Sequence, residues 1–315
     1  MNTVLVLTGR SDITADAVVD ELTRRRAKVV RYDTADFPIS SKIAVTLDSQ
    51  GWQGTLSGDH PIELETISSV WWRRPGEFSI PTGWPDEARA FAASEGRVGV
   101  LGVLGSLPAR WINHPARDSA ANYKPVQLAV AARAGLEVPR TTITSDLKKV
   151  LAFIGDEEMI YKGLSGGVLT PDLRHRYIPT TLLRAADLDE AVAGTAHLIQ
   201  ERVPKAFEVR LTVIGDRMFP VAIHAGSEAG KLDWRTDYAS LTYERLEVPV
   251  DVEKGVRLLM DELGLFYGAL DFAVTPDGRW VFFEVNPNGQ WHWLAVKAGI
   301  PMVEAMADAL QRKDQ

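Results

Sequence analysis

The chain of 315 residues carries 35 Lys and Arg against 42 Asp and Glu, which gives a formal net charge of −7, and it has no cysteine. The absence of cysteine excludes disulfides, thiolate zinc sites, iron–sulfur clusters and a cysteine nucleophile. The negative charge argues against non-specific binding to nucleic acid or to an anionic membrane, because both need a basic surface. The hydrophobic content of 45% is that of an ordinary globular protein, and the length favours about two domains.

The chain shows no segment with the make-up of a targeting signal or a membrane span. The apolar stretch Val4–Leu7 is too short for the core of a signal peptide. The longest mildly apolar stretch, Val98–Ala109, is interrupted by Gly99, Gly102 and Gly105 and is far shorter than a membrane helix. We therefore expect a cytoplasmic protein with neither a membrane nor a nucleic-acid partner.

The first part of the chain, to about residue 115, is expected to be an α/β domain. A strand at Val4–Leu7, a helix at Ala15–Arg26 and a strand at Lys28–Tyr32 give the order typical of a parallel sheet. Two hairpin strands, another strand, a long helix and a short extended segment follow: Ile43–Leu47, Gly54–Leu56, Ser69–Trp72, Asp86–Leu104 and Trp111–Asn113.

The remainder is expected to be α+β, with helices and mixed strands. The predicted helices are Asp118–Ala134, one from Asp146, Ala186–Thr195, Val252–Leu263 and Met302–Gln311. The predicted strands are Thr141–Thr144, Glu158–Lys162, Leu198–Val203, Val209–Ile214, Met218–His224, Gly268–Val274 and Trp280–Val285. The stretch Val168–Thr181 is expected to form a hairpin that turns at Pro171-Asp172.

Asp271, Glu284 and Asn286 form the strongest candidate site. Glu284 and Asn286 lie two residues apart in one strand and so share a face, and the predicted hairpin brings Asp271 beside them. Two carboxylates and an amide oxygen suit Mg²⁺, which shares its coordination with water and nucleotide phosphates. The alternative is that these are ordinary polar residues at the ends of strands, although acidic residues inside apolar strands are unusual.

Three further segments carry weaker signals, each with a plain structural alternative. Lys162 ends a strand before a Gly/Ser loop and could contact phosphate, but an ordinary surface loop would have the same sequence features. Gln200-Glu201, between apolar residues, suits an adenine and ribose hinge, or an amphipathic strand. Arg210 shares a strand face with Glu208, so it could bind an anion or form a salt bridge with Glu208.

Several of the nine Trp residues stand beside arginines, which favours a ligand surface. The clearest cases are Trp71-Trp72-Arg73-Arg74 and Asp233-Trp234-Arg235. A second basic cluster, Arg174-His175-Arg176, could bind an acidic partner or be a solvated loop.

Taken in order, these segments resemble the ATP-grasp superfamily over about residues 113–310. The order is a helical Lys, a strand Lys with a Gly-rich loop, a Gln-Glu hinge, an Arg strand and an Asp…Glu-x-Asn set. Within that superfamily, Trp71-Trp72-Arg73-Arg74-Pro75, Asp233-Trp234-Arg235 and Asn286-Pro287-Asn288-Gly289-Gln290-Trp291 are similar to the maturases of ribosomally made peptides. These are the graspetide, or microviridin-type, macrocyclases.

The resemblance implies an ATP-grasp fold in three parts: an N-terminal α/β (pre-ATP-grasp) domain at 1–115, a central domain at 116–200 and a C-terminal part at 201–315. It also implies a ligase that uses ATP and Mg²⁺ to activate Asp or Glu side chains of a precursor peptide as acyl phosphates. A Ser, Thr or Lys side chain of the same peptide would then attack, giving an ester or an amide. The leader of the precursor would dock on the hairpin around Leu169–Thr181, and the enzyme could be a homodimer.

The resemblance also assigns roles to single residues. By this resemblance, the nucleotide would be bound by Lys124, Lys162, Gly166, Gly167, Gln200, Glu201 and Val203. Metal binding falls to Asp271, Glu284 and Asn286. Arg210 and Arg235 would be catalytic, and Arg73, Arg74, Arg174, Arg176 and Trp234 would bind the substrate. Without the resemblance, Lys124 would be read as a solvent-exposed helical lysine.

Two other functions remain open at this point. The first is an ATP-grasp ligase that joins amino acids or small peptides, for which the hairpin would be dispensable. The second is a nucleotide- or peptide-binding module without catalysis. The sequence names no general base, although His224, Asp233 and His292 are candidates.

Overall fold

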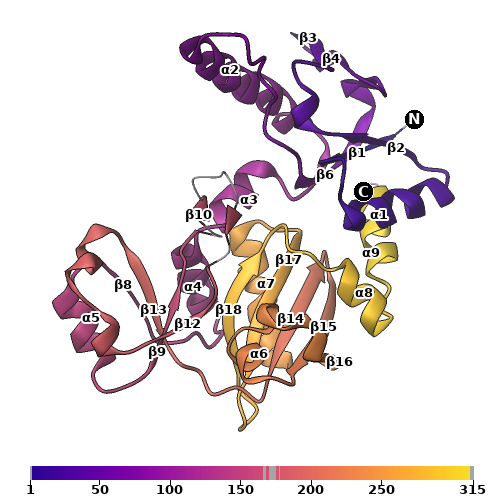
Figure 1. The fold of residues 1–315 in the computed structure, drawn as a ribbon. Coiled ribbons are helices and arrows are strands. Elements are labelled where there is room, and N and C mark those ends of the chain that lie inside the picture. Colours follow the sequence, from indigo (N-terminus) through magenta and orange to yellow (C-terminus); the bar gives the residue numbers. More distant parts are fainter. Residues whose placement is uncertain (1, 166–167, 170–174, 177, 313–315) are drawn as a thin grey trace.

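The N-terminal part of the computed structural model, which describes residues 2–165, 168–169, 175–176 and 178–312, is built on a four-stranded parallel sheet (Figure 1). The strands lie in the order β2-β1-β6-β7, with bounds β1 (Thr3–Thr8), β2 (Lys28–Tyr32), β6 (Ile67–Arg74) and β7 (Arg110–Ile112). Successive residues of the buried strand β1 point to opposite faces of the sheet and join two different apolar clusters. Val4 and Val6 pack with α1 (Ile13–Arg24), whereas Leu5 and Leu7 face α2 (Asp86–Gly105). This two-sided burial explains the unbroken apolar run of β1.

A small antiparallel sheet completes this part of the chain. Its strands are β3 (Lys42–Asp48), β4 (Gly51–Ser57) and the short β5 (Ile62–Glu63). Gly54 has a φ of +127°, and a Cβ there would lie 2.2 Å from the backbone oxygen of Ala44, so the hairpin needs a glycine at this position.

Two helices, α3 (Pro115–Ala121) and α4 (Lys124–Arg133), occupy the segment predicted as one helix at Asp118–Ala134. That prediction was wrong at Asn122–Tyr123, where the helix is interrupted. The reason is Pro125, which has no N–H to donate and is tolerated only in the first turn of a helix. The break makes Lys124 the first residue of α4, in the turn that faces the candidate site.

The central sheet is antiparallel, in the order β12-β9-β13-β8. It consists of β8 (Thr141–Thr144), β9 (Met159–Lys162), β12 (Thr181–Leu183) and β13 (His197–Glu201), with α5 (Leu147–Ile154) packed against it. The helix predicted at Ala186–Thr195 is instead two 3₁₀ turns, Ala185–Asp187 and Glu190–Gly194. Asp189 interrupts it, because its side chain accepts the backbone N–H of Ala191. The hairpin strands β10 (Val168–Leu169) and β11 (His175–Arg176) pair as predicted, but the turn at Pro171-Asp172 lies outside the described residues.

The largest sheet has five antiparallel strands, in the order β16-β15-β14-β17-β18. Its strands are β14 (Phe207–Ile214), β15 (Arg217–Ala225), β16 (Leu241–Arg245), β17 (Tyr267–Val274) and β18 (Trp280–Asn286). Val209 and Leu211 of β14 pack with α4 and α7 (Val250–Leu263) in a large apolar core. The alternate residues, Glu208 and Arg210, lie on the opposite face. Between β15 and β16 lie α6 (Glu228–Leu232) and a 3₁₀ turn at Trp234–Thr236, which the sequence did not predict.

The last two helices, α8 (His292–Ala298) and α9 (Met302–Gln311), return to the N-terminal part of the chain (Figure 1). Met302, Met306 and Leu310 join the apolar cluster that contains Val4 and Val18. Arg25 forms an ion pair with Asp308 at 2.6 Å. Among the helices of the described residues, none is both long enough and apolar enough to cross a membrane.

Candidate functional site

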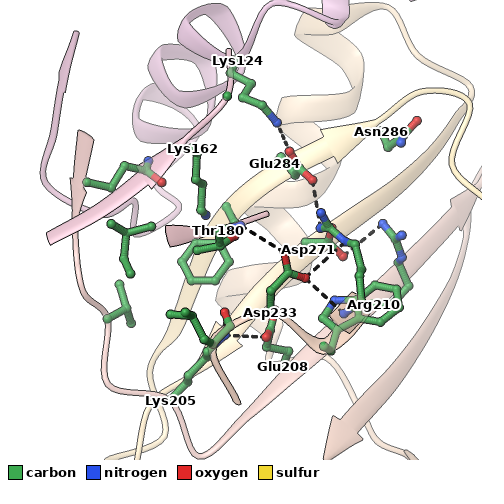
Figure 2. Close-up of a pocket in the computed structure, with 18 of the residues that line it drawn as sticks. Lys124, Lys162, Thr180, Lys205, Glu208, Arg210, Asp233, Asp271, Glu284 and Asn286 are labelled. Atoms are coloured by element: carbon green, nitrogen blue, oxygen red, sulfur yellow. Dashed lines mark hydrogen bonds and ion pairs between the residues drawn. The ribbon is translucent and has the colours of Figure 1, made fainter. Parts of the chain in front are cut away.

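A cavity of about 1010 Å³ lies between the central sheet and the five-stranded sheet (Figure 2). One wall is formed by β9 and β13, and the other by the polar face of β14, β17 and β18. The start of α4 and the segment after α6 close it further. Most of the predicted site residues line it: Lys124, Lys162, Gln200, Glu201, Val203, Arg210, Trp234, Arg235, Asp271, Glu284 and Asn286, with Arg74 also among the lining residues.

The three predicted metal ligands come together on β17 and β18. Asp271 lies directly opposite Glu284 in the strand register, and Asn286 follows two residues later, opposite Ala269. Two arginines contact the carboxylates. Arg210 Nη1 lies 3.0 Å from Asp271 Oδ1, and Arg235 Nη2 lies 3.2 Å from Asp271 Oδ2 and 3.3 Å from Glu284 Oε1. Two acids and two arginines therefore form one charged network on the floor of the cavity.

The two carboxylates differ in their electrostatics. Burial alone would raise the pKa of both, because desolvation penalises the charged form. For Asp271, burial outweighs the two arginines and the pKa is raised. For Glu284, burial is outweighed by Lys124, which donates to Glu284 Oε2, and by Arg235, and its pKa is lowered. Glu284 is therefore the more firmly ionised member of the pair.

The donor set fits a hard divalent cation that also binds phosphate. No cluster of three or more His, Cys, Asp or Glu residues that could hold a metal occurs within the described ranges. The set here has two carboxylates and one carboxamide, which leaves positions for phosphate oxygens and water. The backbone N–H of Asn288 donates to Asn286 Oδ1 at 3.0 Å and so fixes which end of that carboxamide carries the oxygen. Metal binding by these residues stays a prediction.

Two lysines reach the cavity, one from the start of α4 and one from the end of β9. Lys124 extends from α4 to Glu284, and Lys162 lies at the end of β9 with its Nζ 4.0 Å from the centre of the Phe283 ring (Figure 2). Burial lowers the pKa of Lys162 to about 8, although the negative charge of Glu284 opposes this. A partly desolvated lysine of this kind binds an anion strongly, because few water contacts must be given up. Gly166 and Gly167 lie outside the described residues.

The predicted nucleotide hinge, Gln200-Glu201, lies at the end of β13. This strand ends at Glu201, two residues before its predicted end at Val203. Both of its polar side chains already have partners. Gln200 Nε2 donates to Thr141 Oγ1 at 3.0 Å, and Glu201 Oε1 accepts the backbone N–H of Arg140 at 3.0 Å. The side chains thus brace the hinge against β8, while the segment from Gln200 to Val203 lines the cavity.

Trp234 lies beneath the two catalytic-candidate arginines. The guanidinium carbons of Arg210 and Arg235 are 5.5 and 5.3 Å from the centre of its ring, within the range of cation–π interaction. Its other neighbours are Trp293 and Tyr238, each with a ring centre 5.5 Å away. Trp234 is only 3% exposed, so it is mainly a platform that holds the arginines.

The predicted substrate-binding arginines differ in their placement. Arg74 is exposed and lines the cavity. Arg73 is 1% exposed, does not line the cavity and contacts other parts of the chain, so its placement does not favour direct substrate contact. Arg174 lies outside the described residues, and Arg176 lies in β11 of the hairpin. Substrate binding by these residues remains a prediction.

Glu208 and Lys205 line the cavity but were not predicted as site residues, although Glu208 was considered as a partner of Arg210. The suggested Arg210–Glu208 salt bridge was wrong, since Arg210 pairs with Asp271 and Glu208 pairs with Lys205 at 2.5 Å. Glu208 lines the cavity, and burial raises its pKa. The alternation along β14 was a usable signal, because it puts Glu208 on the same face as Arg210.

Comparisons with known proteins agree with this architecture. A family model described as the MvdD pre-ATP grasp domain matches residues 3–119. The macrocyclase MdnC of Microcystis aeruginosa MRC, solved with the precursor peptide MdnA, is 29% identical, with a TM-score of 0.84 over 98% of this chain and 99% of that one. An ATP-grasp ligase of Chryseobacterium gregarium, described as RiPP-associated and solved with ADP and a leader and core peptide, is 26% identical. Its TM-score is 0.89 over 100% and 99% of the two chains.

A third solved structure, the macrocyclase MdnB of Microcystis aeruginosa MRC, is 26% identical with a TM-score of 0.81 over 99% of each chain. No curated protein matches the sequence. These likenesses confirm the predicted fold class and the predicted resemblance to ATP-grasp maturases of ribosomal peptides. The boundaries at residues 115 and 200 stay predictions.

Proposed function

We propose that this chain, an ATP-grasp ligase by its fold and its pre-ATP-grasp domain, joins side chains within a ribosomally made precursor peptide. The observation that carries the proposal is the convergence of two lysines and two arginines on the Asp271–Glu284 pair in one cavity. Such a site neutralises anions and brings them together, as phosphoryl transfer requires. Relatives solved with precursor, leader or core peptides support a peptide as the acceptor of the phosphoryl group.

ATP is proposed to lie across the cavity. Its adenine and ribose would contact the segment from Gln200 to Val203, and its phosphates would lie between Lys124 and Lys162. Asp271, Glu284 and Asn286 would hold Mg²⁺, which when bound supplies positive charge to the phosphate oxygens. The relative from Chryseobacterium gregarium was solved with ADP, which supports a nucleotide in this fold.

Arg210 and Arg235 are proposed to bind the peptide carboxylate and then the acyl phosphate made from it. A guanidinium presents a planar fork of donors that fits both groups. In the first step, a carboxylate oxygen bonds to the γ-phosphorus of ATP while the bond to the ADP oxygen breaks. In the second step, a Ser or Thr hydroxyl or a Lys amine bonds to the acyl carbon, and the carbon–oxygen bond to phosphate breaks. The product is a lactone or a lactam ring.

The attacking group must lose a proton, and no residue is assigned as the base. Of the candidates His224, Asp233 and His292, only Asp233 is among the described residues that line the cavity. Its carboxylate already accepts the backbone N–H groups of Thr180 at 3.3 Å and of Arg235 at 3.1 Å. These bonds favour a role for Asp233 in shaping the wall of the site.

An acidic peptide core must approach a protein whose net charge is −7. Arg74, Arg210 and Arg235 line the cavity and would reverse the sign locally. The leader is proposed to dock on the hairpin that contains β10 and β11. We also propose that the protein is cytoplasmic and forms a homodimer. Size-exclusion chromatography with light scattering tests the dimer.

Intact-mass spectrometry tests the reaction. The purified protein is incubated with Mg-ATP and the short, acid- and Ser/Thr-rich peptide that is encoded nearest to it. We expect ATP-dependent loss of one water for each ring formed, and base hydrolysis of the product then separates ester from amide. The Asp271→Asn variant and a reaction without ATP serve as matched controls.

Other outcomes point to the two alternative functions. An unchanged peptide mass, with ADP released only when free amino acids are added, would favour a small-molecule ligase. An absence of thermal stabilisation by Mg-ATP would favour a peptide-binding module without catalysis, because a nucleotide that binds the folded state would raise its stability.

A further inference from the structure

The segment that follows β18, Pro287–Gln290, is held almost entirely by side chains from other parts of the chain. The backbone oxygen of Pro287 accepts Asn113 Nδ2 at 3.0 Å, and that of Gly289 accepts the Tyr267 hydroxyl at 2.7 Å. The backbone oxygen of Asn288 accepts Arg73 Nη1 at 2.5 Å. We call Pro287–Gln290 the clamped segment. It begins directly after Asn286, the last residue of the predicted metal set.

Arg73 is the main clamp from the N-terminal α/β part. Its second terminal nitrogen, Nη2, donates to Gln290 Oε1 at 2.6 Å, so one guanidinium holds two residues of the clamped segment. Its Nε lies 3.2 Å from Asp12 Oδ2, and both side chains are buried. A buried charge is costly, and it is kept where several partners satisfy its donors in a fixed geometry. A lysine could not span these acceptors, because it is a single point charge.

The clamped segment also fits closely against β17. A Cβ at Gly289 would lie 2.5 Å from the Cβ of Ala269, which is the residue opposite Asn286 in the strand register. Only glycine allows this approach. The segment therefore has little room to move relative to Asn286 once its side-chain partners are in place.

Asn288 connects the clamp to the predicted metal set. Its side-chain Nδ2 donates to Asp118 Oδ1 of α3 at 2.6 Å, while Arg73 and the exposed Arg74 both donate to its backbone oxygen. Its own backbone N–H donates to Asn286 Oδ1 at 3.0 Å. Asn288 is thus held from two sides and in turn fixes the carboxamide oxygen of Asn286.

We propose that Arg73 and Asp118 are positioning residues for the cation site: they fix Asn288, whose backbone N–H holds the carboxamide of Asn286 in one orientation. This inference rests on the proposed function, because it takes Asn286 as a metal ligand. It assigns Arg73, which the sequence suggested as a substrate contact, to the support of the metal site. It also makes the N-terminal part of the chain a component of that site.

The test measures cation binding apart from turnover. Mn²⁺ binding to the full chain is titrated by electron paramagnetic resonance in the presence of saturating ADP, for wild type, Arg73→Lys, Asp118→Ala and Asn286→Ala. We expect Mn²⁺ affinity to fall by about tenfold or more in Arg73→Lys and Asp118→Ala, as for other supports of metal ligands. ADP affinity without metal should stay unchanged. Arg10→Lys is the matched control, since exposed Arg10 pairs with Asp36 and has no contact with the clamped segment.

The outcomes separate the inference from the function on which it rests. If Asn286→Ala binds Mn²⁺ as wild type does, the proposed metal set is wrong. If Asn286→Ala binds weakly while Arg73→Lys and Asp118→Ala bind normally, the positioning role is overturned and the metal set stands. The positioning role would also be overturned if Arg73→Lys and Asp118→Ala lost metal-free ADP affinity by the same factor as Mn²⁺ affinity. That result would indicate a general change of structure. Should Arg73→Lys fail to fold, Asp118→Ala decides, because it leaves the Arg73–Asp12 pair intact.

Discussion

Asp271 and Glu284 lie directly opposite each other on β17 and β18, yet their pKa values move in opposite directions. Burial raises the pKa of Asp271, and the cations around Glu284 lower that of Glu284. Arg235 contacts both carboxylates. Two neighbouring acids in one cavity therefore have different affinities for a proton, and by the same physics they offer different charge to a bound cation.

Neutralising either acid should stop catalysis without unfolding the protein. Asp271→Asn and Glu284→Gln keep the size of the side chain and remove the charge that would hold the cation. We expect the ATP-dependent rate to fall at least about 100-fold, comparable with the loss of a group that stabilises charge in the transition state. The measurement is ADP release with the peptide substrate, alongside circular dichroism. Asp277→Asn, at the exposed turn between the same strands, should retain wild-type activity, and full activity in Asp271→Asn would refute the metal assignment.

Removing either cavity lysine should weaken nucleotide binding. Lys124→Met and Lys162→Met retain most of the aliphatic volume but lose the charge that would face the phosphates. Each should raise the Kd for Mg-ADP by about tenfold, the equivalent of about 1.4 kcal/mol for one lost charge-assisted contact. Isothermal titration calorimetry without peptide gives the value. Lys148→Met, on the exposed side of α5, is the control, and equal affinities in all four proteins would contradict the assignment.

Asp118 should make the stability of the protein depend on pH between about 4 and 6. Burial raises its pKa from 3.8 to about 6, against the hydrogen bonds from Asn122 and Asn288. The folded state therefore holds this proton more tightly than the unfolded state. The resulting stabilisation is present below pH 3.8 and is lost as the pH rises through 6, and a shift of this size corresponds to about 3 kcal/mol.

Asp118→Asn removes the titration and keeps an oxygen that can accept from Asn288. Relative to wild type, the variant should therefore gain stability as the pH rises from 4 to 7. Urea unfolding of both proteins across this range measures the difference in the free energy of unfolding. If the two stability curves run parallel, the pKa of Asp118 is not raised in the folded protein.

Trp234 and Tyr238 should differ sharply in their contribution to stability. Trp234 is 3% exposed and packs against Trp293, whereas Tyr238 is 56% exposed at the rim. Trp234→Ala should lower the free energy of unfolding by about 3–5 kcal/mol, and Tyr238→Ala by about 1 kcal/mol or less. Chemical denaturation measures both. A small loss in Trp234→Ala would mean that the residue serves substrate binding more than packing.

Local patterns were sufficient to predict most of the strands and helices. The alternation in β14 and the apolar run of β1 follow from which faces are buried, and both are visible in the sequence. The predicted Asp118–Ala134 helix was wrong because Pro125 is tolerated only in the first turn of a helix, so a second helix begins there. The strand β16 was not predicted because it is defined by its pairing with β15, a tertiary contact that cannot be inferred from its own residues.

The candidate site was predictable as a set but not in its details. The predicted hairpin was enough to bring Asp271 and Glu284 together, since its register follows from the short connection between the strands, whereas Lys124 was added by the family resemblance alone. The partner of Arg210 was not predictable, because Asp271 lies 61 positions away and the nearer Glu208 was the simpler choice. The contacts of Arg73 were not predictable for a similar reason: its acceptors in the clamped segment lie more than 200 positions away along the chain.

The packing of α9 on α1 has a consequence for the order in which the protein is made. When a ribosome has produced only the first 115 residues, Val4, Val6 and Val18 have no α9 to cover them. The parallel sheet then presents an apolar surface until Met302–Gln311 have emerged, and Ser69 cannot yet donate to the backbone oxygen of Leu310. The earliest part of the chain to be synthesised is therefore among the last to be completed. A fragment cut near residue 115 would carry this surface into solution, where it would favour aggregation.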